Sequence, residues 1–408
     1  MRVVFHFSSS LACLRRQGIL LVMFKNKNIN LLNLHTGLQR FSNSIFDVFG
    51  AIYLLQLGIS FPVVALVWAA SFVLRMFLRP LSLLMAQKIG LKRATIFGTI
   101  IGAGLFLVLA QVNGLTIWLY IFIVFLALYD ITYWLPYHSY YAAVGNYKDR
   151  GKHVGVRGAF VTLFRAAAPI VGAVLISKFG FWSLYLVAMI SMLVSVIPIL
   201  FASDYRQDTS MNFKRALRSI DKRGFLIQIG DGIVYNAHGF MWIIVLFFLT
   251  KNIISFGWLI GFEVLLTAVL FLVLGDMIDK GKGRKILSIG IILFSLVILG
   301  RTFFVYTINA VIISQIAFAV AVVFYRSIFQ TSFYNLAKKT KNTLWFNFFG
   351  EMGWDIGALI ILVLSAVLVS LGLEIRYIMP FAIVGLFVIQ KVLSSYLNNS
   401  YSLSRRED

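Results

Sequence analysis

The chain has 408 residues, of which 60% are hydrophobic and only 13% are charged, whereas about a quarter of the residues in a typical soluble domain are charged. This composition excludes an ordinary water-soluble fold and indicates a protein that crosses the lipid bilayer several times. The single cysteine, Cys13, excludes a disulfide framework, and the five histidines show no metal-binding spacing. We therefore expect no metal and no cofactor.

Apolar runs of about twenty residues, the length that a helix needs to cross a bilayer, recur about twelve times along the chain. In chain order they cover 38–58, 62–84, 94–112, 116–138, 156–177, 182–201, 224–249, 255–275, 286–306, 308–331, 345–371 and 377–397. Only the connection at 202–223 is long. We therefore predict an all-α polytopic membrane protein with two pseudo-symmetric six-helix bundles, 38–201 and 224–398, joined by a cytoplasmic linker.

Basic residues are distributed very unevenly over the connections between these segments. If the N-terminus is cytoplasmic, the outside loops contain only Lys178, Lys251 and Arg376 of the 37 Lys and Arg residues. This bias predicts that both termini are cytoplasmic, and it explains the net charge of +22 without nucleic acid as a partner. We expect residues 1–37 to be a cytoplasmic leader, starting at Met1 or at Met23, and residues 399–408 to be a cytoplasmic tail. We also expect a monomer in the plasma or inner membrane.

Short segments recur in the same order in the two predicted bundles. Residues 45–50 in the first span match 234–239 in the seventh, and Tyr129-Asp130 in the fourth span matches Tyr325-Arg326 in the tenth. Each match is short, but their order along the chain is the same in both halves. The recurrence indicates a duplicated six-helix unit.

A glycine-rich basic motif lies between the eighth and ninth spans. Its residues are Gly275, Asp279, Lys280, Gly283, Arg284 and Lys285, and the corresponding connection in the first half retains Lys88, Gly90, Lys92 and Arg93. The motif resembles the loop motif of the major facilitator superfamily, Gly-x-x-x-Asp-Arg/Lys-x-Gly-Arg-Lys. The segment 168–173 in the fifth span, Ala-Pro-Ile-Val-Gly-Ala, resembles a degenerate form of the helix-5 motif of that family's antiporter branches.

The resemblance covers roughly residues 36–398. It implies a transporter, not an enzyme, in which two bundles rock about a central site lined by spans 1, 4, 7 and 10. We therefore predict a secondary active transporter that moves a small organic solute by alternating access and couples this movement to protons. Two other functions stay open. One is a receptor or assembly factor that kept the fold without transport. The other is a membrane-embedded glycosyl or lipid transferase, although such an enzyme needs catalytic loops outside the bilayer and the outside connections here are short.

Charged residues inside the spans are the candidate functional residues, because an ionised group in hydrocarbon costs at least about 2.5–3.5 kcal/mol. Three carboxylates at mid-span depth are candidates for proton and substrate coupling: Asp47, Glu351 and Asp355. The last two are four residues apart and share one helix face. The candidate gate or cavity charges are Asp130, Arg165 and Arg326, and the candidate cavity-lining residues are Tyr133, Asn236, His238 and Gln330.

Two sets of pairings are open for the gate charges. Asp130 and Arg326 occupy matching positions in spans 4 and 10, so they can meet across the two bundles, directly or through Arg165 and Glu351, when the cytoplasmic side is closed. Alternatively, each charge pairs within its own bundle, Asp130 with Arg165 and Arg326 with Glu351.

Most of the remaining charges in the spans are assigned to structure, whereas Asp231 stays open between local helix pairing and function. Arg79 and Lys391 are expected to extend to the membrane interface, and Arg75 either does the same or pairs with an acid. Glu263 and Arg301 are expected to stabilise the second bundle. None of these residues is selected as a site residue.

Overall fold

The computed structural model describes residues 27–144, 150–204, 221–279, 283–340 and 343–404. These residues form helices joined by short connections, and no strand occurs among them. The helices are α3 (Lys27–Gln56), α4 (Phe61–Ile89), α5 (Leu91–Gln111), α6 (Ile117–Val144), α7 (Arg150–Leu200), α9 (Lys222–Val234), η1 (Tyr235–Phe240), α10 (Met241–Thr250), α11 (Ile253–Asp279), α12 (Gly283–Phe303), α13 (Ile308–Lys339), α14 (Thr343–Ser370), η2 (Ile375–Phe381) and α15 (Ala382–Ser404).

Ten helical segments in the described part of the chain are long and apolar enough to cross a membrane. One of them lies within α7, whose backbone leaves the helical conformation at Gly180 (φ 78°, ψ 177°), so α7 contains two helices. The π-helix η1 continues α9 into α10, and the three form one crossing. With α3, which is more polar than the others, these segments account for the predicted number of about twelve membrane helices, and the predicted fold class is confirmed.

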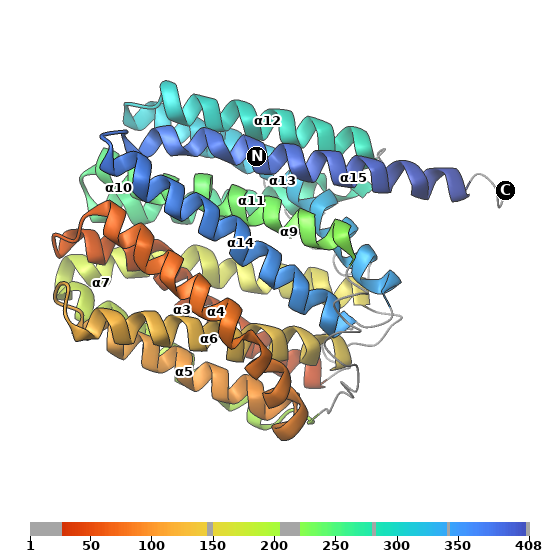
Figure 1. Cartoon of the computed structure of the whole chain (residues 1–408), viewed down its shortest axis with the longest axis horizontal. Coiled ribbons are helices and arrows are strands. Elements are labelled where there is room, and N and C mark those ends of the chain that lie inside the picture. Colours follow the sequence, from red (N-terminus) through yellow and green to blue (C-terminus); the bar gives the residue numbers. More distant parts are fainter. Residues whose placement is uncertain (1–26, 145–149, 205–220, 280–282, 341–342, 405–408) are drawn as a thin grey trace, which may run out of the picture.

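The helices form two bundles, which Figure 1 shows one above the other. Helices α3 to α7 (red to yellow) make the first bundle, in which α3 and α5 both pack on α7. Helices α9 to α15 (green to blue) make the second, in which α14 and α15 both pack on α9. The bundles meet where α4 contacts α14 and where α7 contacts α11.

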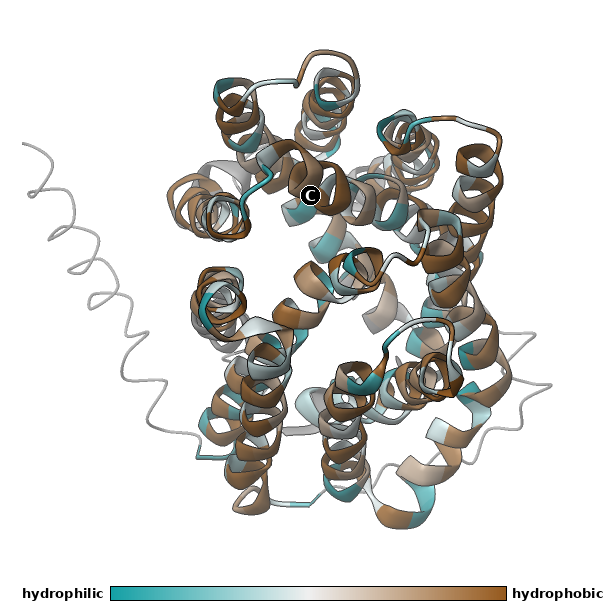
Figure 2. Cartoon of the chain, turned by 90° about the vertical axis from the view of Figure 1, so that its left-hand side faces the viewer, coloured by the Kyte–Doolittle hydropathy of each residue, from teal (hydrophilic) through white to brown (hydrophobic). Residues whose placement is uncertain are grey.

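Apolar side chains cover the outer faces of both bundles, as a hydrocarbon environment requires. Phe77 and Val273 are 78% and 68% exposed, and many other large apolar side chains are exposed along the helices. The ribbon in Figure 2 is brown along most of each helix and is teal mainly in short patches. These exposed faces are the surfaces that would contact lipid.

Glycines allow helix backbones to approach closely at several places, including the contacts of α9 with α14 and of α7 with α11. A Cβ atom on Gly357 of α14 would lie 2.2 Å from the carbonyl oxygen of Ile229 in α9, and one on Gly257 of α11 would lie 2.4 Å from that of Pro169 in α7. Pro169 belongs to the 168–173 segment singled out in the sequence. That segment therefore forms part of the contact between the two bundles.

Candidate functional site

A cavity of about 450 Å³ lies between the two bundles. Its wall is built by α3 and α7 of the first bundle and by η1, α10, α11, α12 and α13 of the second. The polar and aromatic residues that line it include Asp47, Arg165, Tyr235, His238, Trp242, Glu263, Arg301, Arg326 and Gln330. Five of these residues, Asp47, Arg165, His238, Arg326 and Gln330, are candidates selected from the sequence.

Asp47 and Arg165 line the same side of the cavity, and their helices are joined by a hydrogen bond. Ser44, almost one helical turn before Asp47, donates from Oγ to the backbone carbonyl of Arg165 at 3.1 Å. Both charged side chains are exposed to the cavity. Neither makes an ion pair within 4 Å with any residue that the structure describes. The cavity thus contains one carboxylate and one guanidinium group that are not held by a protein partner in that range.

Arg326 lines the cavity from the opposite bundle and is held by an acid of its own bundle. Its Nη1 atom lies 2.8 Å from Oδ1 of Asp231 in α9. The neighbouring Tyr325 donates from its hydroxyl to the same oxygen atom at 3.4 Å. The alternative in which Arg326 pairs with Glu351 is therefore wrong for this structure, because Asp231 is the acid that α9 brings next to α13.

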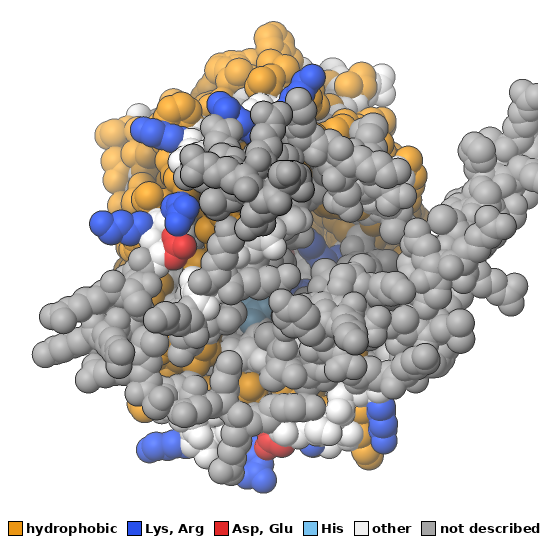
Figure 3. All heavy atoms as spheres, turned by 90° about the vertical axis from the view of Figure 1, so that its right-hand side faces the viewer, with side chains coloured by type: hydrophobic (Ala, Val, Ile, Leu, Met, Phe, Trp, Pro, Cys, Tyr) orange, Lys and Arg blue, Asp and Glu red, His pale blue; other side chains and the backbone are white. Residues whose placement is uncertain are grey.

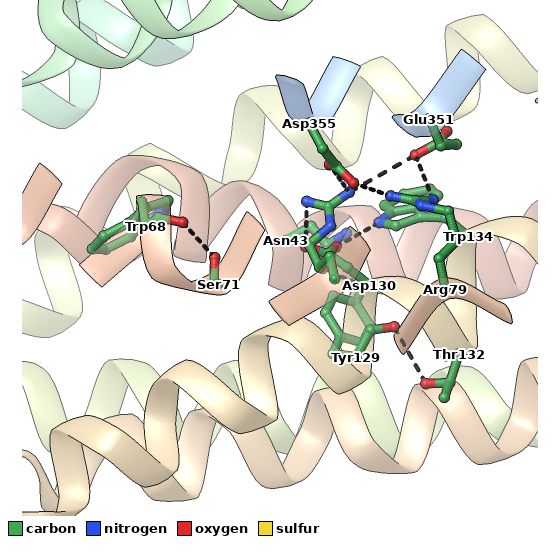
Figure 4. A network of polar contacts seen from close by, with 11 residues as sticks. Asn43, Trp68, Ser71, Arg79, Tyr129, Asp130, Thr132, Trp134, Glu351 and Asp355 are labelled. Carbon is green, nitrogen blue, oxygen red and sulfur yellow. Dashed lines mark hydrogen bonds and ion pairs between the residues drawn. The ribbon is translucent and has the colours of Figure 1, made fainter. Parts of the chain in front are cut away.

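A charge cluster connects the two bundles where α4 crosses α14 (Figure 4). Arg75 Nη1 lies 2.9 Å from Asp130 Oδ2 of α6, and Arg75 Nη2 lies 3.0 Å from Asp355 Oδ1 of α14. Arg79, one turn further along α4, donates a hydrogen bond to Asp355. Glu351 lies 3.8 Å from each of the two arginines. We call these five residues the α4–α14 charge cluster.

This cluster corrects three expectations from the sequence. Asp130 contacts neither Arg326 nor Arg165. Its ion-pair partner is Arg75, which lies between α6 and α14. Arg79 does not extend to the membrane interface; its side chain is only 2% exposed and is bonded to Asp355. Both arginines lie on one face of α4, four residues apart, and this spacing directs both of them toward α14.

The acids of the α4–α14 charge cluster differ in burial, and they outnumber its arginines. The side chain of Asp355 is 0% exposed, whereas that of Glu351 is 25% exposed. Three carboxylates face two guanidinium groups, so the cluster is neutral only when one carboxyl group carries a proton. Asp355 contacts both arginines and, together with Asp130 and Glu351, compensates their charges, because an uncompensated buried ion is strongly destabilising.

A second cluster surrounds Arg301 in the wall of the cavity. Its Nη2 atom donates to Glu263 of α11 at 2.8 Å and also to Gln315 of α13, and its Nη1 atom lies 3.2 Å from His238 Nε2. The guanidinium group stacks over the ring of Trp242 at 4.0 Å. Arg301 is 1% exposed, so Glu263 and these polar groups compensate a buried charge. The predicted structural role of Glu263 and Arg301 agrees with this pairing.

Two predicted lining residues lie elsewhere. Tyr133 is completely buried in the first bundle, where its hydroxyl lies 3.0 Å from His35 Nε2. Asn236 is 2% exposed and donates to the carbonyl of Gly232 in its own helix at 2.9 Å. Tyr235 and Trp242 also line the cavity but were not predicted from the sequence. Their spacing from His238, three residues before and four after, is the helical signal that would have found them.

The first-half loop motif has a structural role at the end of α7. Gly90 adopts a positive φ of 84° at the turn between α4 and α5, a backbone conformation that is strained for residues other than glycine. Lys92 donates from Nζ to the carbonyls of Leu200 and Ala202, both at 2.7 Å, which places its charge at the negative end of the helix dipole. Lys88 and Arg93 are exposed.

The second-half loop motif is described only in part. Arg284 and Lys285 are exposed at the start of α12, next to Gly283. Lys280 and the side chain of Asp279 lie outside the described residues, and so do the surroundings of Gly275.

The arrangement defines a membrane transporter, because a cavity containing polar groups lies between two helix bundles in the middle of a polytopic fold. In the amino-acid sequence, residues 33–256 match the family model of the Major Facilitator Superfamily. The match covers more than half of the chain, so the protein belongs to this family. It is an integral multi-pass membrane protein and a transporter, not an enzyme.

Solved structures of transporters share the fold. A mutant of the nucleoside transporter NupG superposes with a TM-score of 0.69 at 14% identity, covering 89% of this chain and 99% of that chain. Unmutated NupG gives 0.66 at 14% identity, with 90% and 98% covered. Tetrameric PepTSo2 gives 0.63 at 12% identity, with 93% and 99% covered. No curated protein sequence matches this chain.

Proposed function

We propose that this protein is a secondary active transporter that moves a small organic solute through the central cavity by alternating access. The cavity carries the proposal, because its volume of about 450 Å³ lies within the range of roughly 300–1,000 Å³ that small-molecule sites have. Its wall combines charged groups with aromatic rings from both bundles. A solute bound there would contact both bundles, which is the condition for coupling its binding to their movement.

We further propose that Asp47 is the group that couples transport to protons. Asp355 and Glu351, the other two carboxylates selected from the sequence, belong to the α4–α14 charge cluster and face two arginines. Asp47 instead faces the cavity and has no ion pair within 4 Å among the described residues. A carboxyl group in that position can take up a proton from one side of the membrane and release it to the other as the cavity changes access.

The α4–α14 charge cluster is the contact that alternating access would remake. Its arginines belong to the first bundle, and Asp355 and Glu351 belong to the second. If the bundles rotate at this crossing, the ion pairs must break or exchange partners. We propose that the cluster stabilises the conformation seen here against the alternative one.

The distribution of charge supports a cytoplasmic position for both termini. Lys and Arg side chains lie around the end of the molecule shown in Figure 3, next to the apolar surface. The opposite end has only short connections (Figure 1), and the cytoplasmic side of membrane proteins carries the excess of basic residues.

We propose that this protein works as a monomer, because the lining of the cavity is complete within one chain.

Reconstitution into proteoliposomes tests the proposed function. The solute would first be found by thermal-shift screening of the purified protein against metabolite pools, because a ligand that binds the folded state raises its stability. An imposed proton gradient should then drive accumulation of that solute by the wild-type protein. Asp47→Asn should abolish this accumulation but preserve solute exchange. Glu374→Gln is the matched control, because this carboxylate lies outside the cavity, 3.2 Å from Arg376.

Two results would contradict the proposal. If Asp47→Asn concentrates the solute as well as the wild type, Asp47 does not couple transport to protons. If the protein binds a solute but moves none under any gradient, the receptor or assembly-factor alternative gains support. A transferase is disfavoured by the family to which the chain belongs.

A further inference from the structure

Most charged side chains that the structure describes inside the membrane helices have an ion-pair partner. Arg75 and Arg79 pair with acids of the α4–α14 charge cluster, Arg301 pairs with Glu263, and Arg326 pairs with Asp231. Asp47 and Arg165 differ from them. They line the cavity, and within the described part of the chain they have no partner within 4 Å. This difference suggests that their partners are not protein side chains.

The surroundings of Asp47 and Arg165 are mainly positive. Asp47 interacts electrostatically with Arg40 of its own helix, with Asp130 of α6 and with Arg165 of α7. It also interacts with Tyr235 of η1, which in turn interacts with Arg326 of α13. Two arginines, Arg40 and Arg165, and one acid, Asp130, therefore act on this carboxyl group, while Arg326 is already paired with Asp231. A cationic solute at Asp47 would lie in a repulsive field, whereas an anionic solute beside Arg165 would lie in an attractive one.

A carboxylate is the anion that suits this position. A guanidinium group offers parallel N–H donors that match the two oxygens of a carboxylate, and charged hydrogen bonds of this kind are the strong ones. The aromatic rings of Tyr235, Trp242 and Phe318 in the cavity wall would contact an apolar body. With Asp47 ionised, a bound anion leaves the site with one excess negative charge, and a proton on Asp47 removes that excess.

We propose that the solute of this transporter is a small organic acid with one carboxylate, which binds Arg165, and that one proton binds at Asp47 with each anion. This inference rests on the proposed function and adds the substrate class to it. Arg165 acts as the anion-binding residue, and Asp47 acts as the proton acceptor. No bond is formed or broken in the solute, and the anion and the proton together cross the membrane without net charge.

Binding of simple acids to the purified protein in detergent tests the charge requirement. The probes are benzoate and hexanoate, with benzamide, benzylamine and phenylalanine as an uncharged, a cationic and a zwitterionic comparison. Benzoate or hexanoate should raise the unfolding temperature of the wild type, more at mildly acidic than at mildly alkaline pH. Arg165→Gln should weaken this binding by about 10- to 100-fold, the range for loss of a charged hydrogen bond. Lys391→Gln, which removes an exposed cation outside the cavity, should bind as the wild type does.

Asp47→Asn separates the role of the proton from that of the anion site. This variant should bind the carboxylate with little dependence on pH, because its side chain can no longer accept the proton. The proposal is overturned if neither acid stabilises the wild type, if benzylamine or phenylalanine binds in their place, or if Arg165→Gln binds benzoate normally. The proposed function fails separately, if benzoate binds as expected but proteoliposomes do not move it.

Discussion

Asp355→Asn should destabilise the protein far more than Glu351→Gln, although the two acids lie one helical turn apart on α14. Each change removes one negative charge and keeps the size of the side chain. Asp355 is completely buried and contacts both Arg75 and Arg79, whereas Glu351 is 25% exposed and lies 3.8 Å from each arginine. The difference between the two variants therefore measures the value of close contact in the cluster and not that of charge alone.

The two costs follow from burial. Removing one partner of a buried ion pair costs about 3–5 kcal/mol, and Asp355→Asn removes the close partner of both arginines, so that Arg79 keeps only Glu351 at 3.8 Å. A longer and partly exposed pair such as that of Glu351 contributes about 0–1 kcal/mol. If the cluster also holds the observed conformation, a loss of about 3–5 kcal/mol lowers the population of that conformation relative to the other by a factor of hundreds to thousands.

Two measurements on each variant check these values. Thermal unfolding in detergent gives the relative stability, and distance distributions between paired labels at the ends of α4 and α14 give the population of each conformation. Adding Arg79→Gln to Asp355→Asn should recover part of the lost stability, because fewer charges stay uncompensated. Equal effects of the two single changes, or additive effects of Asp355→Asn and Arg79→Gln, would refute the proposed energetics. A lower stability with unchanged distances would show a structural role and contradict the role in conformational change.

Two further predictions concern packing and orientation. Gly357→Ala should lower the unfolding temperature strongly, because its Cβ atom would lie 2.2 Å from the carbonyl of Ile229, whereas Gly300→Ala, with nothing within 4 Å, should be neutral or slightly stabilising; equal unfolding temperatures would contradict the close packing of α9 and α14. In a cysteine-free background, a membrane-impermeant thiol reagent added outside cells should label a cysteine at Asn252 but not one at Lys285. The reverse pattern would overturn the orientation.

Hydropathy predicted the membrane helices well, but the first helix extends further toward the N-terminus than the predicted crossing. The predicted span is 38–58, whereas α3 begins at Lys27. Its first turns contain polar residues that hydropathy counts against a membrane helix. One of them, His35, is completely buried between a backbone carbonyl of Ser195 and the hydroxyl of Tyr133. Such satisfied polar contacts are not visible in an apolar run, so the helix boundary could not be predicted from it.

The sequence revealed which charges lie inside the membrane but not how they pair. Position along a span gives the depth of a residue, and several acids share the depth of Arg75 and Arg79. The choice among them depends on the rotation of α4 about its axis, which turns both arginines toward Asp355. Repeat symmetry was misleading here, because Asp130 and Arg326 match in sequence but each binds a residue from a different helix.

In the proposed function, the cost of charge in hydrocarbon would connect Asp47 and Arg165 to the transport cycle. Each ionised group that leaves water inside the membrane costs at least about 2.5–3.5 kcal/mol on insertion scales. For residues in ion pairs, the attraction of the partner offsets this cost. Asp47 and Arg165 offset it by facing the cavity, where water can reach them. When the cavity closes and water leaves, both charges need another partner. A proton on Asp47 and an anion on Arg165 would neutralise the two groups together, so the loaded cavity should close more readily than one that has bound the anion without the proton.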